Sequence, residues 1–136
     1  MEIPQIPEGT NVVGVGIDQI EVSRIRESVK RHGDGFLNKV FTPEEQNSCM
    51  ERADPAPCLA ARFAVKEAVS KALGTGIGKE FGWLDVAVKK EENGKPVAHF
   101  SAHGLKAMNH IGAGSALISL SHLENVASAV SVLVKE

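Results

Sequence analysis

Side chains suited to holding a metal ion and phosphate groups are spread along the 136-residue chain. Asp18 and Glu67 carry carboxylate oxygens, the ligands that Mg²⁺ prefers. Arg62, Lys71 and His122 can donate charged hydrogen bonds to phosphate oxygens. Together these residue types predict a site for a divalent metal ion and phosphates, provided that the fold brings them together.

Glu67 and Lys71 belong to a stretch, residues 59–73, that is apolar on nearly every side at helical spacing. It predicts one long, buried central helix, in which charges are costly unless they are paired or bound to a ligand. Their spacing also fits a simple ion pair that supports the helix by roughly 0.2–0.5 kcal/mol. The following turn, GTGIG at 74–78, either ends the helix with a left-handed Gly74 or lets backbone N–H groups approach a ligand. Both interpretations stay open on this stretch alone.

Asp18 and His122 are each expected just after a strand. The first strand is predicted over residues 11–17, NVVGVGI, and a later core strand over residues 115–121, SALISLS. The two glycines of the first strand allow either a bend or the close approach of another group. Two strand ends of this kind would present one acidic and one imidazole side chain.

The next predicted helix covers residues 19–31, and two of its features have alternative explanations. Asp18 with Glu21 resembles a capping box, which would give Asp18 a purely structural role at the helix start. Arg24 and Arg31 lie two turns apart and face the same way. Such a basic face suits an acidic partner, although a simply solvated face is the commoner case.

Caps and turns mark the remaining elements. These are a short turn or helix over 36–41, a helix from Thr42 to about Arg52, strands over 84–90 and 96–100 joined by an Asn93-Gly94 hairpin, a short helix from Ser101, and a final strand over 126–134. The order is β-α-α-α-β-β-α-β-β. Its two hairpin-like pairs of strands predict an α+β fold, an antiparallel sheet with packed helices.

Composition limits the class of protein. With 43% hydrophobic residues and a net charge of −2, the chain is predicted to be one globular domain over 1–136, with a loose N-terminal segment over 1–10. It has no basic excess for nucleic acid binding, no apolar run of the roughly 20 residues that span a membrane, and no signal segment. Cys49 and Cys58 lack metal-ligand spacing, so reduced thiols in a cytoplasmic protein are expected rather than a disulfide.

Four segments carry a resemblance to a known family. They are GVGIDQIEVSRI at 14–25, RFAVKEAVSKALGTGIG at 62–78, NGKP at 93–96 and SLSH at 119–122. In order and spacing they resemble holo-[acyl-carrier-protein] synthase, the small bacterial type of 4′-phosphopantetheinyl transferase. The similarity runs from about Gly14 to Val134, and G-x-D followed by K-E-A-x-x-K-A is specific to that superfamily.

The resemblance implies an enzyme that transfers 4′-phosphopantetheine from coenzyme A to a serine of apo-acyl carrier protein, for fatty acid biosynthesis. The other product would be adenosine 3′,5′-bisphosphate. Asp18 and Glu67 would bind Mg²⁺, or Mn²⁺ in its place, and both would act in catalysis together with Lys71. A cytoplasmic homotrimer with a site at each subunit interface is implied as well.

The resemblance also implies contacts with the two substrates. Those with coenzyme A fall on Arg62, Lys71, Gly74, Thr75, Gly76, Ser121 and His122. Those with the acidic carrier protein fall on Arg24, Arg31 and Phe36. Two positions depart from the family pattern, Leu117 in place of a polar residue and Val126 in place of an aromatic one. Both departures concern the lining of the nucleotide pocket, and neither removes a metal ligand.

Two other functions fit the same residues. A non-catalytic module could bind acidic proteins through Arg24 and Arg31, which predicts no coenzyme A binding and no metal dependence. A phosphohydrolase acting on coenzyme A or another nucleotide would release pantetheine phosphate without any carrier protein.

Overall fold

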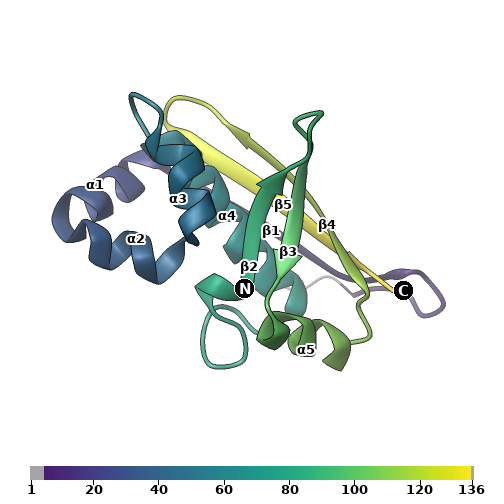
Figure 1. Cartoon of the computed structure of the whole chain (residues 1–136). Coiled ribbons are helices and arrows are strands. Elements are labelled where there is room, and N and C mark those ends of the chain that lie inside the picture. Colours follow the sequence, from purple (N-terminus) through teal and green to yellow (C-terminus); the bar gives the residue numbers. More distant parts are fainter. Residues whose placement is uncertain (1–4, 136) are drawn as a thin grey trace.

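The computed structural model of the protein describes residues 5–135 (Figure 1). The helices are α1 (Val22–His32), α2 (Asp34–Val40), α3 (Pro43–Met50), α4 (Ala56–Leu73) and α5 (Ala102–His110), with a 3-10 turn at Trp83–Asp85. The strands are β1 (Val12–Glu21), β2 (Val86–Lys90), β3 (Pro96–Phe100), β4 (Ser115–His122) and β5 (Val126–Val134). Residues 5–10 contain no helix or strand, and the rest of the segment predicted to be loose, 1–4, lies outside the described residues.

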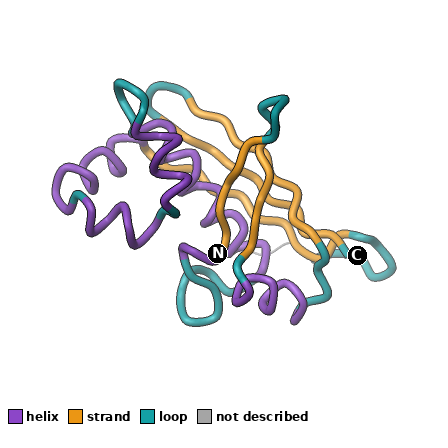
Figure 2. Tube along the Cα trace, viewed as in Figure 1, coloured by secondary structure: helices purple, strands orange, loops and turns teal. Residues whose placement is uncertain are grey.

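The strands form two antiparallel sheets rather than one. β1, β5 and β4 make a three-stranded sheet in that order, and β2 pairs with β3 as a hairpin. Figure 2 shows the long strands side by side, with most helical turns gathered to one side of them. The predicted α+β class and order of elements are confirmed, and α2 is the segment for which the sequence allowed a turn or a helix. No helix in the described residues is long and apolar enough to cross a membrane.

The predicted central helix is α4, and it packs on one face of the three-stranded sheet. Its side chains are buried on most sides, as the apolar pattern requires. A Cβ atom at Gly16 would collide with the carbonyl oxygen of Ala68, and one at Gly14 with that of Ala72. The close approach that these glycines permit is therefore the approach of α4 itself, which brings the β1 backbone directly onto the helix.

The first strand is longer than the sequence predicts, and this changes the position of Asp18. β1 continues to Glu21 because its pairing with β5 runs on through Asp18, opposite Ala129, to Glu21, opposite Val126. α1 begins at Val22, and no side chain caps its first turn. The capping-box interpretation of Asp18 is therefore wrong, since Asp18 lies within a strand.

Local signals place most of the other boundaries correctly. Thr42 forms the full capping box with Glu45, Ser101 caps α5, and Gly74 ends α4 in the left-handed conformation with φ 81°. Two expectations need correction. The strand predicted from residue 84 begins at Val86, because the preceding residues form the 3-10 turn. β4 is an edge strand rather than a core strand, and its Leu117 is 57% exposed.

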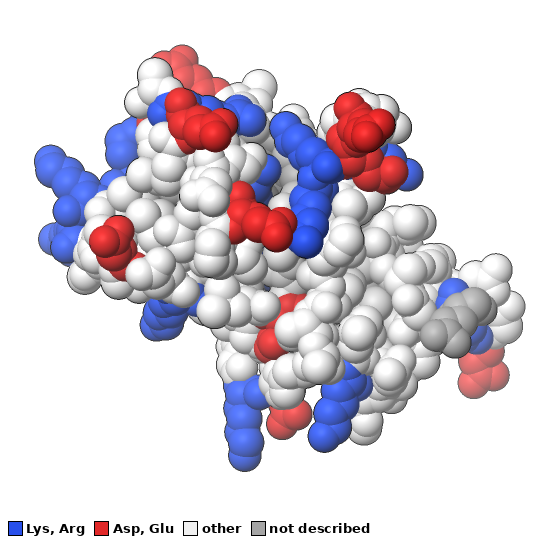
Figure 3. Space-filling model, viewed as in Figure 1, with Lys and Arg blue, Asp and Glu red and all other residues white. Residues whose placement is uncertain are grey.

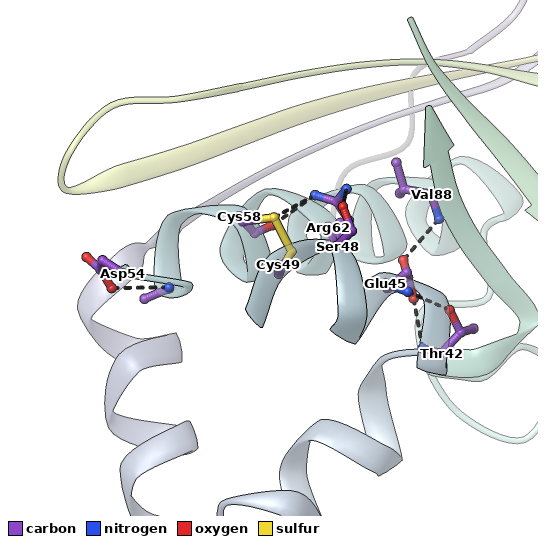
Figure 4. Close-up of a disulfide and its surroundings, with 9 residues drawn as sticks. Thr42, Glu45, Ser48, Cys49, Asp54, Cys58, Arg62 and Val88 are labelled. Carbon is purple, nitrogen blue, oxygen red and sulfur yellow. Dashed lines mark hydrogen bonds between the residues drawn. A yellow bond between two sulfur atoms is a disulfide. The ribbon is translucent and has the colours of Figure 1, made fainter. Parts of the chain in front are cut away.

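The expectation of two reduced thiols is also contradicted. Cys49, near the end of α3, and Cys58, in the first turn of α4, form a disulfide across a Cα–Cα distance of 5.4 Å (Figure 4). α3 and α4 are joined by a short exposed loop, residues 51–55, and pack against each other. This packing, which no cysteine spacing encodes, brings the two sulfur atoms together.

We predict that Gly16→Ala lowers the free energy of unfolding by about 1–3 kcal/mol or more. The added methyl group would collide with the carbonyl oxygen of Ala68 where β1 packs on α4. The measurement is urea unfolding followed by circular dichroism. Gly35→Ala is the matched control. Gly35 lies in α2 with no atom near the position of an added Cβ, so this change should be neutral or stabilising by about 0.5–1 kcal/mol. Equal effects of the two substitutions would contradict the packing described here.

Candidate functional site

Asp18 and Lys71 meet where β1 crosses α4. The Lys71 Nζ donates to Asp18 Oδ1 at 2.9 Å and to the carbonyl oxygen of Ile17 at 3.2 Å. Both side chains are partly buried, so the ion pair is less screened than one on the open surface. The partner of Lys71 is thus a strand residue from 53 positions earlier, and not Glu67 one turn before it on the helix. The simple helix-supporting pair of Glu67 with Lys71 is not formed among the described residues.

Glu67 lies one turn before Lys71 on α4, at the same crossing. Burial raises the pKa of the Glu67 carboxyl, and the negative charge of Asp18 raises this pKa further. The positive charge of Lys71 acts in the opposite direction on the same pKa. Asp18, Glu67 and Lys71 are therefore within electrostatic reach of one another, two carboxylates and one ammonium group at the edge of the helix.

The two carboxylates fit a small divalent cation. Mg²⁺ takes oxygen ligands and usually binds only one or two protein carboxylates, with substrate phosphate and water completing its shell. No group of three or more His, Cys, Asp or Glu residues in the described chain could hold a metal by itself. A cation beside Asp18 and Glu67 would relieve the like-charge repulsion that raises the pKa of Glu67.

The glycine turn after α4 uses its first N–H groups to end the helix. The N–H of Gly74 donates to Lys71 O, and the N–H groups of Thr75 and Gly76 both donate to Ser70 O. The Thr75 hydroxyl donates to Gly76 O at 2.8 Å. The helix-ending interpretation of Gly74 is therefore confirmed, and these three N–H groups already have acceptors in this structure.

Arg62 does not join the cluster at Asp18. It lies five residues before Glu67, so it points roughly 140° away around the helix. Its side chain is buried against α3, where Nη1 donates to Cys58 Sγ at 3.0 Å and Nη2 to Ser48 Oγ at 3.3 Å (Figure 4). Within one chain, the guanidinium and the two carboxylates thus face different parts of the molecule.

Ser121 and His122 are also separated from Asp18. They are exposed at the end of β4, and β5 lies between β4 and β1. His122 pairs with Ala127, which in turn pairs with Ile20 on β1, so two strand spacings of about 5 Å each separate His122 from that strand. Successive residues of a strand point to opposite faces, so Ser121 and His122 face opposite ways.

The residues predicted to bind a partner lie on α1 and α2. Arg24 and Arg31 are exposed on α1, where Arg31 Nε pairs with Glu27 Oε1 at 3.2 Å. Basic side chains gather at the left edge of the molecule in Figure 3, where α1 lies in Figure 1. Phe36 is half-buried on α2 and makes an edge contact with Phe41, with ring centroids 5.9 Å apart.

Sequence reasoning missed a buried ion pair between Lys66 and Glu45. Lys66 Nζ lies 2.8 Å from Glu45 Oε1 and donates to the carbonyl oxygens of Trp83 and Val86, while Glu45 Oε2 accepts from the Val88 N–H. Both side chains are fully buried, and removing one partner of such a pair costs about 3–5 kcal/mol. The sequence does show a lysine on an apolar helix, which indicates that the lysine needs a partner but does not identify the partner as Glu45.

We predict that Asp18→Asn lowers the pKa of Glu67, because the substitution removes a negative charge that now raises it. Lys71→Met should raise the pKa of Glu67, because it removes the cation that now lowers it. The measurement is an NMR titration of the side-chain carboxyl carbon of Glu67 in the two variants. A Glu67 titration that neither substitution moves would show that the three side chains do not share a site.

Comparison with known proteins points to one family. A family model described as the 4′-phosphopantetheinyl transferase superfamily matches residues 14–128. The holo-[acyl-carrier-protein] synthase of Chlamydia pneumoniae is 43% identical over 121 residues, which cover 89% of this chain and 96% of that protein. The corresponding enzyme of Protochlamydia amoebophila is 44% identical over 120 residues, which cover 88% of this chain and 96% of that protein.

Solved structures of the same family have a similar fold. The Neisseria meningitidis holo-[acyl-carrier-protein] synthase matches with a TM-score of 0.84 and 31% identity, covering 91% of this chain and 99% of that one. The Helicobacter pylori enzyme, solved in complex with coenzyme A, matches with a TM-score of 0.78 and 35% identity, covering 88% of this chain and 98% of that one. This chain therefore belongs to the 4′-phosphopantetheinyl transferase superfamily and, within it, to the holo-[acyl-carrier-protein] synthases, a family of transferases.

Proposed function

We propose that the protein transfers 4′-phosphopantetheine from coenzyme A to a serine hydroxyl of apo-acyl carrier protein. The products would be the holo-carrier and adenosine 3′,5′-bisphosphate, and the pathway would be fatty acid biosynthesis in the cytoplasm. The names of the relatives and the coenzyme A complex of the Helicobacter pylori enzyme support the substrates. The cluster of Asp18, Glu67 and Lys71 is the single observation on which the proposed chemistry depends.

Asp18 and Glu67 would hold a divalent cation, Mg²⁺ or in its place Mn²⁺. Such an ion supplies Lewis-acid stabilisation of the charge that develops on phosphate oxygens. Lys71 would contact the transferred phosphoryl group and stabilise its transition state electrostatically. Its ion pair with Asp18 holds the ammonium group at the edge of the site. In the proposed complex, a phosphate of coenzyme A would replace the Asp18 carboxylate as the partner of Lys71.

The acceptor serine must lose a proton during the transfer, and the two carboxylates are its proposed acceptors. Burial and the charge of Asp18 raise the pKa of Glu67 above that of an ordinary glutamate. A higher pKa makes a carboxylate a stronger base, but a bound cation would lower the pKa of Glu67 again. A water molecule held by the metal ion is therefore a third proposed acceptor of the serine proton.

The carrier and the nucleotide would bind on different surfaces. The exposed Arg24 and Arg31 on α1, with the half-buried Phe36 on the following helix, α2, would dock the acidic carrier protein. The remaining predicted coenzyme A contacts would come from the glycine turn, from Arg62 and from the end of β4. This assignment places the positive face of a slightly negative protein against an acidic partner.

We also propose that the protein works as a homotrimer with its sites at subunit interfaces. One argument is the sheet face turned away from α4, where Val15, Val132 and Leu117 form one row of paired residues and Ile17 and Val130 the next. Ile17 is 69% exposed and Leu117 57% exposed, and an open apolar face of this kind marks an interaction site. The other argument is the separation of the exposed His122 from Asp18 within one chain, since another subunit would bring its own His122 to this site.

We predict that Glu67→Gln lowers kcat/KM for transfer by at least roughly 100-fold, because loss of even outer-shell metal partners typically costs 10–100-fold. The assay combines apo-carrier, coenzyme A and Mg²⁺, with mass spectrometry of the carrier. Glu51→Gln, at an exposed position in the loop after α3, is the control and should leave the rate unchanged. Near wild-type transfer by Glu67→Gln would refute the metal role. Release of pantetheine phosphate without a carrier would instead favour the phosphohydrolase, and no coenzyme A binding would favour the non-catalytic module.

We predict that Arg24→Glu raises KM for the carrier roughly tenfold, because it reverses one charge facing an acidic partner. The dissociation constant for coenzyme A, measured by calorimetry, should stay nearly unchanged. Lys135→Glu reverses the same charge near the C-terminus and serves as the control. A parallel loss of coenzyme A binding in Arg24→Glu would contradict the docking assignment.

A further inference from the structure

Arg62 is a buried cation that pairs with no carboxylate among residues 5–135. Its side chain is only 4% exposed, and its Nε atom is buried without a hydrogen-bond partner. Burial lowers the pKa of Arg62, the charge of Glu45 raises it in part, and the charge of Arg52 lowers it. Glu45 itself forms its ion pair with Lys66. A cation in apolar surroundings is costly unless an anion reaches it. Binding of an anion would therefore stabilise the guanidinium, but its burial keeps an anion from reaching it.

The groups that enclose Arg62 are those that the disulfide joins. Nη1 donates to the sulfur and to the carbonyl oxygen of Cys58, and Nη2 donates to Ser48, the neighbour of Cys49 in the chain (Figure 4). The Cys49–Cys58 bond thus links α3 to the first turn of α4, the helix that carries Arg62, next to the guanidinium. All three contacts are hydrogen bonds to uncharged acceptors, and the two that do not involve sulfur are long, at 3.3 and 3.4 Å.

The two ends of α3 are held by different interactions. The N-terminal end is anchored by the capping box at Thr42 and by the buried pair of Glu45 with Lys66. The C-terminal end carries Cys49 and leads into an exposed loop, residues 51–54, whose side-chain contact with α1 is a surface ion pair of Asp54 with Arg26. Breaking the disulfide would therefore loosen the C-terminal end of α3 beside Arg62 and leave the N-terminal end in place.

We propose that Cys49 and Cys58 are a reversible thiol-modification site whose disulfide keeps Arg62 buried, and whose reduction opens Arg62 to a phosphate-bearing ligand. The identity of that ligand, coenzyme A, rests on the proposed function. The proposed function places the protein in the cytoplasm, where disulfides are usually transient and serve catalysis or redox sensing rather than permanent stabilisation. Both sulfur atoms are buried, so exchange follows local opening of the loop at 51–54.

The reaction is a thiol–disulfide exchange with a small dithiol. A thiolate of the dithiol attacks one protein sulfur, the Cys49–Cys58 bond breaks, and the second dithiol sulfur then displaces the other cysteine. The dithiol loses two electrons and two protons and closes to a cyclic disulfide, while the two cysteines gain both and become thiols. A small disulfide reverses the exchange, taking up the same two electrons and two protons as it becomes two thiols.

The first test measures access to Arg62 without using coenzyme A. The full-length protein, oxidised or reduced, is treated with phenylglyoxal, which modifies arginine guanidinium groups, and each arginine is followed by peptide mass spectrometry. Reduction should speed the modification of Arg62 by at least about tenfold, equivalent to about 1.4 kcal/mol, while exposed Arg24 is modified equally in both states. The double variant Cys49→Ser with Cys58→Ser should match the reduced protein under both conditions. Unchanged reactivity of Arg62 overturns the proposal, as does failure of a small disulfide to remove the two thiols.

The second test measures coenzyme A binding by calorimetry in the same two states. Reduced protein should bind at least about tenfold more tightly, and Arg62→Ala should abolish the difference between the states. Equal affinity in the two states overturns the proposal. Absence of coenzyme A binding in both states, with redox-dependent labelling of Arg62 intact, refutes the proposed function and supports the thiol site.

Discussion

The close contact between the backbone of β1 and the helix α4 is the constraint on which the candidate site depends. Gly14 and Gly16 have no side chains, and the carbonyl oxygens of Ala68 and Ala72 occupy the space that a Cβ atom would need. Asp18 lies two residues beyond Gly16 on the same face of the strand, where its carboxylate reaches Lys71 on α4. A bulkier strand would stand further from α4, and Asp18 would then be too far away to share a site with it.

The central helix solves the problem of buried charge in three different ways. Lys66 is wholly buried, and two carbonyl oxygens and one carboxylate satisfy its ammonium group. Lys71 keeps partial contact with solvent and pairs with Asp18, which leaves its charge available to a ligand. Arg62 is buried with neutral acceptors only, beside a disulfide. The arrangement of Lys66 is typical of a side chain with a structural role. Lys71 and Arg62 are instead arranged so that a substrate or a regulatory change could act on their charge.

A single chain contains only part of the constellation that the sequence suggested. Asp18, Glu67 and Lys71 come together, while Arg62 faces α3 and His122 lies across the sheet on β4. The same sheet leaves an apolar face uncovered. The position of His122 and the uncovered face are the two observations on which the proposed homotrimer rests.

Local signals in the sequence determined the α+β class, the buried helix α4, and the caps at Thr42, Gly74 and Ser101, since each acts over a few neighbouring residues. The family, with the candidate carboxylates, was also recognisable from motifs alone. Only the tertiary structure decided that Asp18 lies inside a strand, that Lys66 pairs with Glu45, and that the two cysteines join. These outcomes depend on contacts between separate elements of the fold, whose geometry no local pattern specifies.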